Sequence, residues 1–327
     1  MVNTTSMSIS TIKFLLKDME TPEKLFSGSK FPDIAELYKK HVNSFWTDDI
    51  FHFDEDLQDW ETLSAEKQHF VKHILAFFAK ADLLVADNLV SQFLREVDLK
   101  ESQDFYAIQN LIERIHNETY ERMLNCFVGN LEERARLNLA HLTVPSIKAK
   151  ADWAQKWMDA RRPFGERLLA FICIEGIHFC TSFAGIYWIK DQGLMKQLTK
   201  SNEYISRDES LHVMHGMMLF KHLSKKPEIG IIHQIIGEAV ELEKEFCTEA
   251  IPCNFSGLNT GMMQDYVEFI ANQYLETMGL DLLYKKKSNP LGFMTKVTAK
   301  IQNNFFESEN ADYSLSSNHA DNGDYDF

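Results

Sequence analysis

The sequence contains few cysteines, prolines or glycines, and these shortages exclude several classes of protein. Its 327 residues include 5 cysteines, 7 prolines and 14 glycines. The cysteines form no Cys-x-x-Cys pair, and their odd number suits a reducing compartment better than a disulfide framework. No Gly/Ser-rich or Pro-rich linker divides the chain. We therefore expect one main domain, although the length alone would allow two.

Basic residues are also in short supply. Lys and Arg number 34 against 48 Asp and Glu, which gives a formal net charge of −14. No basic cluster offsets phosphate repulsion, so the charge argues against nucleic acid as a direct partner. Residues 1–20 show no basic segment followed by an apolar run. We therefore expect no signal peptide and a cytoplasmic location.

Strand-like alternation is equally scarce, and apolar residues recur at helical spacing instead. We expect long helices before Pro145 and after Pro163. These two prolines are expected to interrupt the shorter helical pieces between them. Ser64 is predicted to cap the N-terminus of one long helix, and Ser201 that of the helix carrying Glu209. The expected helical ranges are 31–46, 64–89, 102–128, 227–251 and 262–283.

One apolar run, residues 168–189, is long enough to span a bilayer. Glu175 and His178 stand near its middle, where a membrane helix carries ionisable groups only at high cost. We expect a helix buried in a bundle, with no membrane association. A membrane span is the alternative.

Acids and histidines on otherwise apolar helical faces indicate a metal site. Positions i and i+3 lie on one face of a helix, so Glu113 projects with His116, and Glu209 with His212. An unpaired buried carboxylate costs several kcal/mol, whereas two divalent cations allow facing carboxylates to ionise. With one acid from each of two further apolar helices, the predicted metal ligands are Asp82, Glu113, His116, Glu175, Glu209 and His212.

The types of ligand residue limit both the choice of metal and the choice of fold. Carboxylate and imidazole without thiolate suit iron or manganese, and zinc usually takes fewer ligands per ion. Single acids from two helices with Glu-x-x-His from two others are the arrangement of ferritin-like di-iron proteins. The sequence thus predicts an all-α, ferritin-like helical bundle with a dinuclear metal site in its core.

Four further residues could belong to the metal site, and each also has an ordinary structural interpretation. Glu66 and His69 also form a Glu-x-x-His pair, but polar neighbours favour a solvated edge. His178 could be a ligand, although Glu175 already supplies the ligand of its helix. Tyr120 is either an oxidisable phenol near the metal or an ordinary buried tyrosine with a satisfied hydroxyl.

Several motifs, taken in order, resemble the small, radical-generating subunit of class I ribonucleotide reductase in its eukaryotic and viral form. The motifs are FPDIAELYKKHVNSFWT, HILAFFAKAD, IERIHNETY, FICIEGIHFCTSFAGIYWIK, GLMKQLTKSNEYISRDESLH and NPLGFM. The resemblance covers nearly all of the chain from Phe31 onward. It implies a homodimer that works with a large subunit. Some members of this family lack metal-ligand residues. This chain is not expected to be one of them, because it has a ligand residue at every expected position.

The resemblance also implies roles for individual residues. The predicted ligands match those of two iron ions per chain, with manganese as the alternative metal. Tyr120 matches the tyrosine that ferrous iron and dioxygen (O2) oxidise to a stable radical. Trp46, Asp208 and Tyr313 match the route of radical transfer to the large subunit, which reduces ribonucleoside diphosphates to deoxyribonucleotides for DNA replication. We accordingly expect an oxidoreductase that is active only with its large subunit.

Around the radical site, the match is less complete. Phe179 and Phe183 match the apolar pocket that shields the radical. His178, beside this pocket, and Leu83, after the first ligand, depart from the family pattern.

The chain is predicted to have a flexible segment at 1–30, a helical domain at 31–305 and an acidic flexible tail at 306–327. The tail contains many acids and no Lys or Arg, so it cannot bury enough apolar area to fold. The resemblance implies that it docks on the large subunit; a solubilising tail is the alternative. Two other functions compete with the reductase: a stand-alone di-iron oxidase or hydroxylase, and a ferritin-like iron store.

Overall fold

The computed structural model describes residues 31–285, 288–295 and 297. These residues form a bundle of helices with one two-stranded hairpin, so the prediction of an all-α bundle is confirmed. The expected flexible segment at 1–30 and the acidic tail at 306–327 lie outside the described residues. The main helices are α3 (Pro32–Asn43), α5 (Ala65–Asn88), α7 (Lys100–Phe127), α10 (Pro145–Trp157), α11 (Phe164–Cys173), α12 (Cys180–Asp191), α13 (Lys196–His222), α14 (Ile229–Glu249) and α15 (Thr260–Thr277).

Shorter elements connect these helices. They are η1 (Asp48–Ile50), η2 (Phe53–Asp56), α4 (Leu57–Thr62), η3 (Leu89–Phe93), α6 (Leu94–Glu96), α8 (Leu131–Asn138), α9 (Ala140–Thr143), η4 (Ile174–His178), η5 (Gly292–Met294) and the antiparallel strands β1 (Asn254–Phe255) and β2 (Leu258–Asn259). The hairpin and the two π-helical turns, η3 and η4, were not expected from the sequence.

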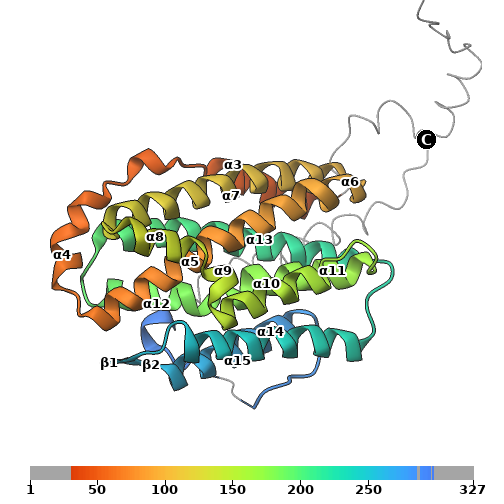
Figure 1. Ribbon diagram of the computed structural model, residues 1–327. Helices are drawn as coiled ribbons and strands as arrows, with labels where there is room; N and C mark the ends of the chain where they lie inside the picture. Colours follow the sequence, from red (N-terminus) through yellow and green to blue (C-terminus); the bar gives the residue numbers. More distant parts are fainter. Residues whose placement is uncertain (1–30, 286–287, 296, 298–327) are drawn as a thin grey trace, which may run out of the picture.

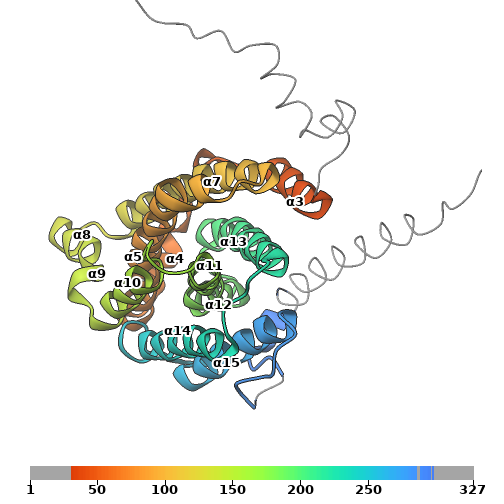
Figure 2. The same ribbon diagram turned by 90° about the vertical axis from the view of Figure 1, so that its right-hand side faces the viewer.

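The most apolar helices lie at the centre of the bundle. In the end-on view, α11 and α12 occupy the middle, with α5, α7, α13, α10, α14 and α15 around them (Figure 2). The side view shows α14 and α15 along one side, with α3 and α7 on the opposite side (Figure 1). Because the central helices are covered by neighbours on all sides, an apolar sequence with little periodicity suits them.

The stretch Phe164–Asp191 is the one segment in the described part of the chain that is long and apolar enough to cross a membrane. The most apolar part of this stretch is entirely buried inside the bundle, as the sequence led us to expect. This stretch is interrupted by the π turn η4, which adds one residue to a helical turn. Such turns often occur at functional sites, and here η4 carries Glu175.

Of the two serine caps predicted at helix N-termini, one is present in the structure and the other is not. Ser64 caps α5, because its hydroxyl accepts the backbone N–H of Lys67 at 3.4 Å. The expectation that Ser201 caps the helix carrying Glu209 is wrong, since α13 begins at Lys196 and the Ser201 hydroxyl donates to the carbonyl of Leu198.

Distant carboxylates cap α13 in place of Ser201. The Asp56 carboxylate accepts the N–H groups of Gln197 and Leu198 at 3.0 and 2.7 Å, and Asp59 accepts that of Met195 at 2.8 Å. Negative charge at a helix N-terminus is stabilising. These carboxylates are far from α13 in the sequence, so no local sequence motif predicts the cap.

Candidate metal centre

The predicted ligands converge in the core of the bundle. Asp82 comes from α5, Glu113 and His116 from α7, Glu175 from the π turn η4, and Glu209 and His212 from α13. All are buried. Their ligand atoms form two groups, each within 4.8 Å: Asp82, Glu113, His116 and Glu209 in one, and Glu113, Glu175, Glu209 and His212 in the other.

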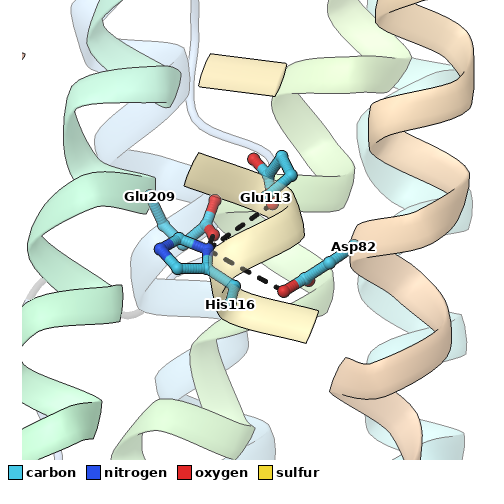
Figure 3. A group of neighbouring side chains, drawn as sticks. All are labelled: Asp82, Glu113, His116 and Glu209. Atoms are coloured by element: carbon cyan, nitrogen blue, oxygen red, sulfur yellow. Dashed lines mark ion pairs between the residues drawn. The ribbon is translucent and has the colours of Figure 1, made fainter. Parts of the chain in front are cut away.

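The two Glu-x-x-His glutamates belong to both groups. The Nδ1 atom of His116 lies 3.5 Å from Glu113 Oε2 and 3.0 Å from Glu209 Oε1 (Figure 3). The Nδ1 atom of His212 lies 3.0 Å from Glu113 Oε1 and 3.1 Å from Glu209 Oε2. Each glutamate thus directs one oxygen to each imidazole, so both carboxylates would be available to two cations at once.

Each group also has a carboxylate of its own. Asp82 Oδ2 lies 3.8 Å from His116 Nδ1, as Figure 3 shows. On the other side, the side-chain amide of Gln109 donates to Glu175 Oε1 at 2.7 Å and orients that carboxylate. Each of the two groups, which could hold a metal ion, thus contains one imidazole, one carboxylate of its own and two shared carboxylates.

Several buried polar atoms in this cluster make no hydrogen bond to the described residues, although some of them face one another as carboxylate–imidazole ion pairs. They are both oxygens of Asp82, both oxygens of Glu113, Glu175 Oε2, Glu209 Oε1 and His116 Nδ1. Buried carboxylates without partners are costly, and cations between them remove that cost. The donor set of carboxylate oxygen and imidazole nitrogen fits iron or manganese.

Burial and mutual charge strongly shift the pKa values in the cluster. Burial raises the pKa values of Asp82 and Glu175 well above the usual carboxylic range. It acts in the same direction on Glu113, but the neighbouring His212 and His116 lower the pKa of Glu113 to about 2. Burial acts to lower the pKa values of both histidines, yet the surrounding carboxylates hold them well above the usual range. Without cations, the cluster retains protons.

Tyr120 lies on α7 within the same core. Its hydroxyl has no hydrogen-bond partner among the described residues, and burial followed by the charge of Asp82 raises its pKa well above the usual value. The ring of Phe78 stacks on Tyr120, with centroids 4.9 Å apart and planes 6° apart. Phe179 and Phe183 both contact Phe78. Phe78 is therefore the nearest aromatic neighbour, and its role was missed although it lies four residues before Asp82 on one helical face.

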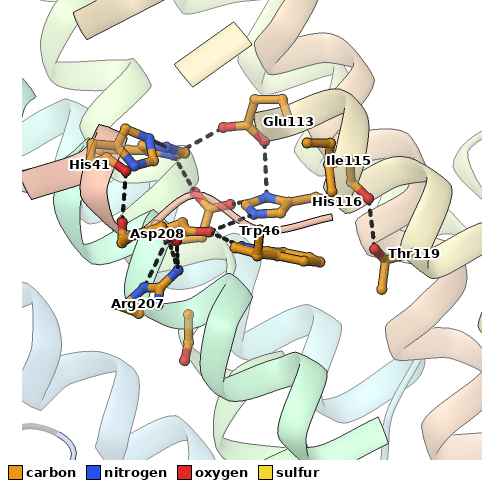
Figure 4. A network of polar contacts seen from close by, with 12 residues as sticks. His41, Trp46, Glu113, Ile115, His116, Thr119, Arg207 and Asp208 are labelled. Atoms are coloured by element: carbon orange, nitrogen blue, oxygen red, sulfur yellow. Dashed lines mark hydrogen bonds and ion pairs between the residues drawn. The ribbon is translucent and has the colours of Figure 1, made fainter. Parts of the chain in front are cut away.

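Trp46 and Asp208 form a buried polar link to His116 of the cluster. The indole Nε1 of Trp46 donates to Asp208 Oδ2 at 2.6 Å, and the same oxygen lies 3.4 Å from His116 Nε2 (Figure 4). The Trp46 ring also stacks on His116, with centroids 5.8 Å apart. Arg207 holds the other oxygen of Asp208. The structure thus joins three residues predicted separately from the sequence, whereas Tyr313 lies outside the described residues.

His178 belongs to neither metal group. Its ring packs edge-on against Trp153, with centroids 4.9 Å apart. Its backbone carbonyl accepts a hydrogen bond from the buried ammonium of Lys150 at 2.8 Å. His178 therefore serves the packing behind the π turn, on the side of α10.

Sequence reasoning missed His41 altogether. This buried residue of α3 contacts the ligand His212 through ring nitrogens 3.0 Å apart. A signal existed, since Ile34, Leu37 and His41 recur at helical spacing on one buried face. The partner on α13 could not be read from that spacing.

A large cavity reaches this cluster from the side of α12, α13 and α15. Its volume is about 230 Å³, and both Glu175 and Glu209 lie in its wall. The remaining wall is mostly apolar, with Phe183, Val213 and Met217 among its residues. A small apolar molecule can therefore approach two of the carboxylates.

Comparisons with known proteins agree with this geometry. The family described as "Ribonucleotide reductase, small chain" matches residues 25–290. The chain is 43% identical to the ribonucleoside-diphosphate reductase small chain of Spisula solidissima, over 87% of this chain and 74% of that protein. It is 42% identical to the corresponding small chain of Vaccinia virus (strain Ankara), over 87% of this chain and 89% of that one.

Solved structures show the same fold. The Saccharomyces cerevisiae ribonucleotide reductase Rnr4 homodimer matches with a TM-score of 0.77 and 29% identity, over 93% of this chain and 96% of that chain. The dimanganese(II)-NrdF of Streptococcus sanguinis matches with a TM-score of 0.70 and 16% identity, over 82% of this chain and 95% of that chain. Because the identity of the second match is only 16%, it supports the fold alone.

Proposed function

This chain belongs to the family of ribonucleotide reductase small chains, and on that premise we propose how its buried cluster generates and exports a radical. The chain is the small subunit of a ribonucleoside-diphosphate reductase, an oxidoreductase that requires a large subunit. The cluster of carboxylates and imidazoles is a dinuclear metal site. The identity of the metal, the residue that becomes oxidised and the segment that docks on the large subunit are our own proposals.

We assign the two metal positions to iron. Asp82 and His116 would hold one ion, Glu175 and His212 the other, and the shared glutamates would lie between them. When bound, the two ions supply the power to oxidise a side chain at the expense of dioxygen. Manganese is the alternative metal, because it fits the same oxygen and nitrogen ligands.

Tyr120 is the residue that becomes oxidised. It would give up one electron and its phenolic proton, both consumed in the reduction of dioxygen, which leaves a neutral tyrosyl radical. Burial, the stacked ring of Phe78 and the apolar side chains of Phe179 and Phe183 exclude water and reductants. The absence of a hydrogen-bond partner for the hydroxyl, in the part of the chain that is described, suits a group that must exist without its proton.

Trp46 and Asp208 carry the oxidising equivalent away from the centre. Trp46 contacts the ligand His116 by stacking and through the shared Asp208 carboxylate. The Tyr120 radical takes up an electron from Trp46 and a proton, which restores the phenol, and the Asp208 carboxylate that accepts the indole N–H is placed to take the proton that oxidised Trp46 releases. We assign the next step, toward the large subunit, to Tyr313 of the tail.

The remaining features concern assembly. We propose that the chain forms a homodimer, as the yeast relative does, and that residues 306–327 dock on the large subunit. We also propose a cytoplasmic location, with neither nucleic acid nor membrane as a partner.

One observation carries the assignment: Glu113 and Glu209 each direct one oxygen to each of the two imidazoles. The test is the metal content of variants reconstituted with ferrous iron. Wild type should bind two ions per chain, and Glu209→Ala or His116→Ala fewer, with helicity retained. Glu66→Ala, in an exposed Glu-x-x-His pair, should bind as wild type does. Undiminished iron in both core variants would refute the ligand assignment.

The competing functions predict other behaviour. A stand-alone di-iron oxidase or hydroxylase would turn over an organic substrate without the large subunit. An iron store would take up many ions per chain. Nucleotide reduction that depends on the added large subunit, with two ions per chain, separates the reductase from both.

A further inference from the structure

The two imidazoles of the metal centre have different partners behind them. His116 Nε2 faces the carboxylate of Asp208 at 3.4 Å. His212 Nε2 instead lies 3.0 Å from Nε2 of His41, and both of these rings are buried. One ligand ring is therefore supported by a carboxylate and the other by a second imidazole.

The tautomers follow from the ligand geometry. Nδ1 of His212 faces Glu113 and Glu209, so a metal would use that atom. A ligating imidazole is neutral and carries its remaining hydrogen on the other nitrogen. Nε2 of His212 therefore donates to Nε2 of His41, and the hydrogen of His41 lies on Nδ1.

The position of His41 is set by packing. Its neighbours on α3, Ile34 and Leu37, belong to a small apolar cluster with Phe105 of α7 and Leu211 of α13. Phe105 also lies beside the imidazole of His41, with ring centroids 5.3 Å apart. Figure 4 shows His41 at the left of the network, apart from His116. Helix α3 thus delivers a nitrogen acceptor to one metal position only.

We propose that His41 is the positioning residue of the metal position that contains His212, and that it makes this position electronically different from the one that contains His116. A partner that accepts the distal N–H fixes the ring orientation and raises the basicity of the ligand. An imidazole does so less strongly than a carboxylate, because charge-assisted hydrogen bonds are the stronger ones. The inference rests on the proposed metal site and adds a residue that acts on one half of it.

Manganese(II) binding to the metal-free protein tests the proposal without any enzymatic readout. Free Mn(II) is followed by electron paramagnetic resonance during titration of wild type, His41→Leu and His41→Gln. Removing a ligand's outer partner typically lowers metal affinity by about 10- to 100-fold. His41→Leu should weaken one of the two binding constants by that factor and leave the other near its wild-type value. In His41→Gln the amide oxygen can accept the same hydrogen, so most of the affinity should return.

His215 supplies a matched control. It is another buried imidazole in the same region, but it bonds to Ser102 rather than to a ligand. His215→Gln should leave both manganese constants unchanged. Equal weakening of both constants by His41→Leu, or no weakening, would overturn the proposal.

A second variant keeps the test decisive if His41→Leu fails to fold. His41→Asp places a carboxylate behind His212, as Asp208 stands behind His116, and should tighten one manganese constant. Unchanged or weaker binding would overturn the proposal. The proposed function fails separately, if wild type itself binds no metal.

Discussion

The indole N–H of Trp46 donates to Asp208 Oδ2 at 2.6 Å and joins residues 162 positions apart in the sequence. Burial acts to raise the pKa of Asp208, but the hydrogen bond from His116 and the charge of Arg207 lower the pKa to about 2. The carboxylate is therefore ionised at neutral pH and accepts hydrogen bonds from both Trp46 and His116. It links the buried indole of Trp46 to His116 of the cluster and is not itself one of the proposed metal ligands.

Breaking this connection should separate radical formation from radical export. With iron supplied at saturating concentration, which offsets the weaker affinity expected when the partner of His116 is changed, Asp208→Asn and Trp46→Phe should still bind metal and form the Tyr120 radical, yet lose nucleotide reduction by at least about 10-fold. Iron analysis, electron paramagnetic resonance and a reductase assay with the large subunit measure the three properties. Glu203→Gln, an exposed carboxylate on the same helix that pairs with Lys190, should change none of them. Full reductase activity in both core variants would rule out this route.

Replacing the radical residue should leave the metal centre in place. Tyr120→Phe keeps the buried ring against Phe78 and removes only a hydroxyl without a described partner. The variant should bind iron and consume dioxygen, and its paramagnetic resonance spectrum should lack the tyrosyl signal. Tyr187→Phe is a matched control that should retain the signal. A wild-type signal in Tyr120→Phe would place the radical on another tyrosine, with Tyr187 and Tyr204 as the first candidates.

Metal binding should release protons and strengthen with rising pH. In the metal-free state, Asp82 and Glu175 have raised carboxyl pKa values, and His116 and His212 have raised imidazole pKa values. The metal-bound state carries fewer protons, so lower pH favours the metal-free state. Calorimetric titration in buffers of different ionisation enthalpy counts the released protons, and at least about one per chain is expected at neutral pH. Binding that is insensitive to pH would contradict this description of the cluster.

A buried ion pair behind the π turn should be important for stability. Lys150 Nζ lies 2.6 Å from Glu243 Oε2 and also donates to the carbonyl of His178, and both charged groups are buried. Removing one partner leaves an uncompensated buried charge, so Lys150→Met should lower the free energy of unfolding by about 3–5 kcal/mol. The double variant Lys150→Met/Glu243→Leu should recover part of that loss. Denaturant unfolding measures both, and a single variant as stable as wild type would show that the pair contributes little.

Two functions of the tail should be separable, although the tail lies outside the described residues. Deleting residues 321–327 should weaken association with the large subunit, because a segment of such acidic composition is expected to bind by ordering on its partner. Tyr313→Phe should leave association nearly unchanged and abolish nucleotide reduction. Sedimentation or calorimetry with the large subunit measures the first effect and a reductase assay the second. Full activity of the truncated chain at low partner concentration would exclude docking by these residues, and an active Tyr313→Phe would exclude the relay.

The sequence by itself determined the helical class, the buried central helix and the residues that face the core. Helical spacing places Glu113 with His116 and Glu209 with His212 on one face each, because a helix repeats every 3.6 residues whatever surrounds it. The capping serine Ser64 could be read in the same way, since its partner is the N–H of a residue in the first turn.

Only the tertiary structure decided which atoms meet across helices. The contact of His41 with His212 spans 171 positions, and the cap of α13 by Asp56 spans 142. Such contacts depend on how each helix is rotated and translated against its neighbours, and the periodicity of one helix contains no information about that. For the same reason, the sharing of Glu113 and Glu209 between two imidazoles, and the stacking of Phe78 on Tyr120, emerged only once α5, α7 and α13 were packed around the centre.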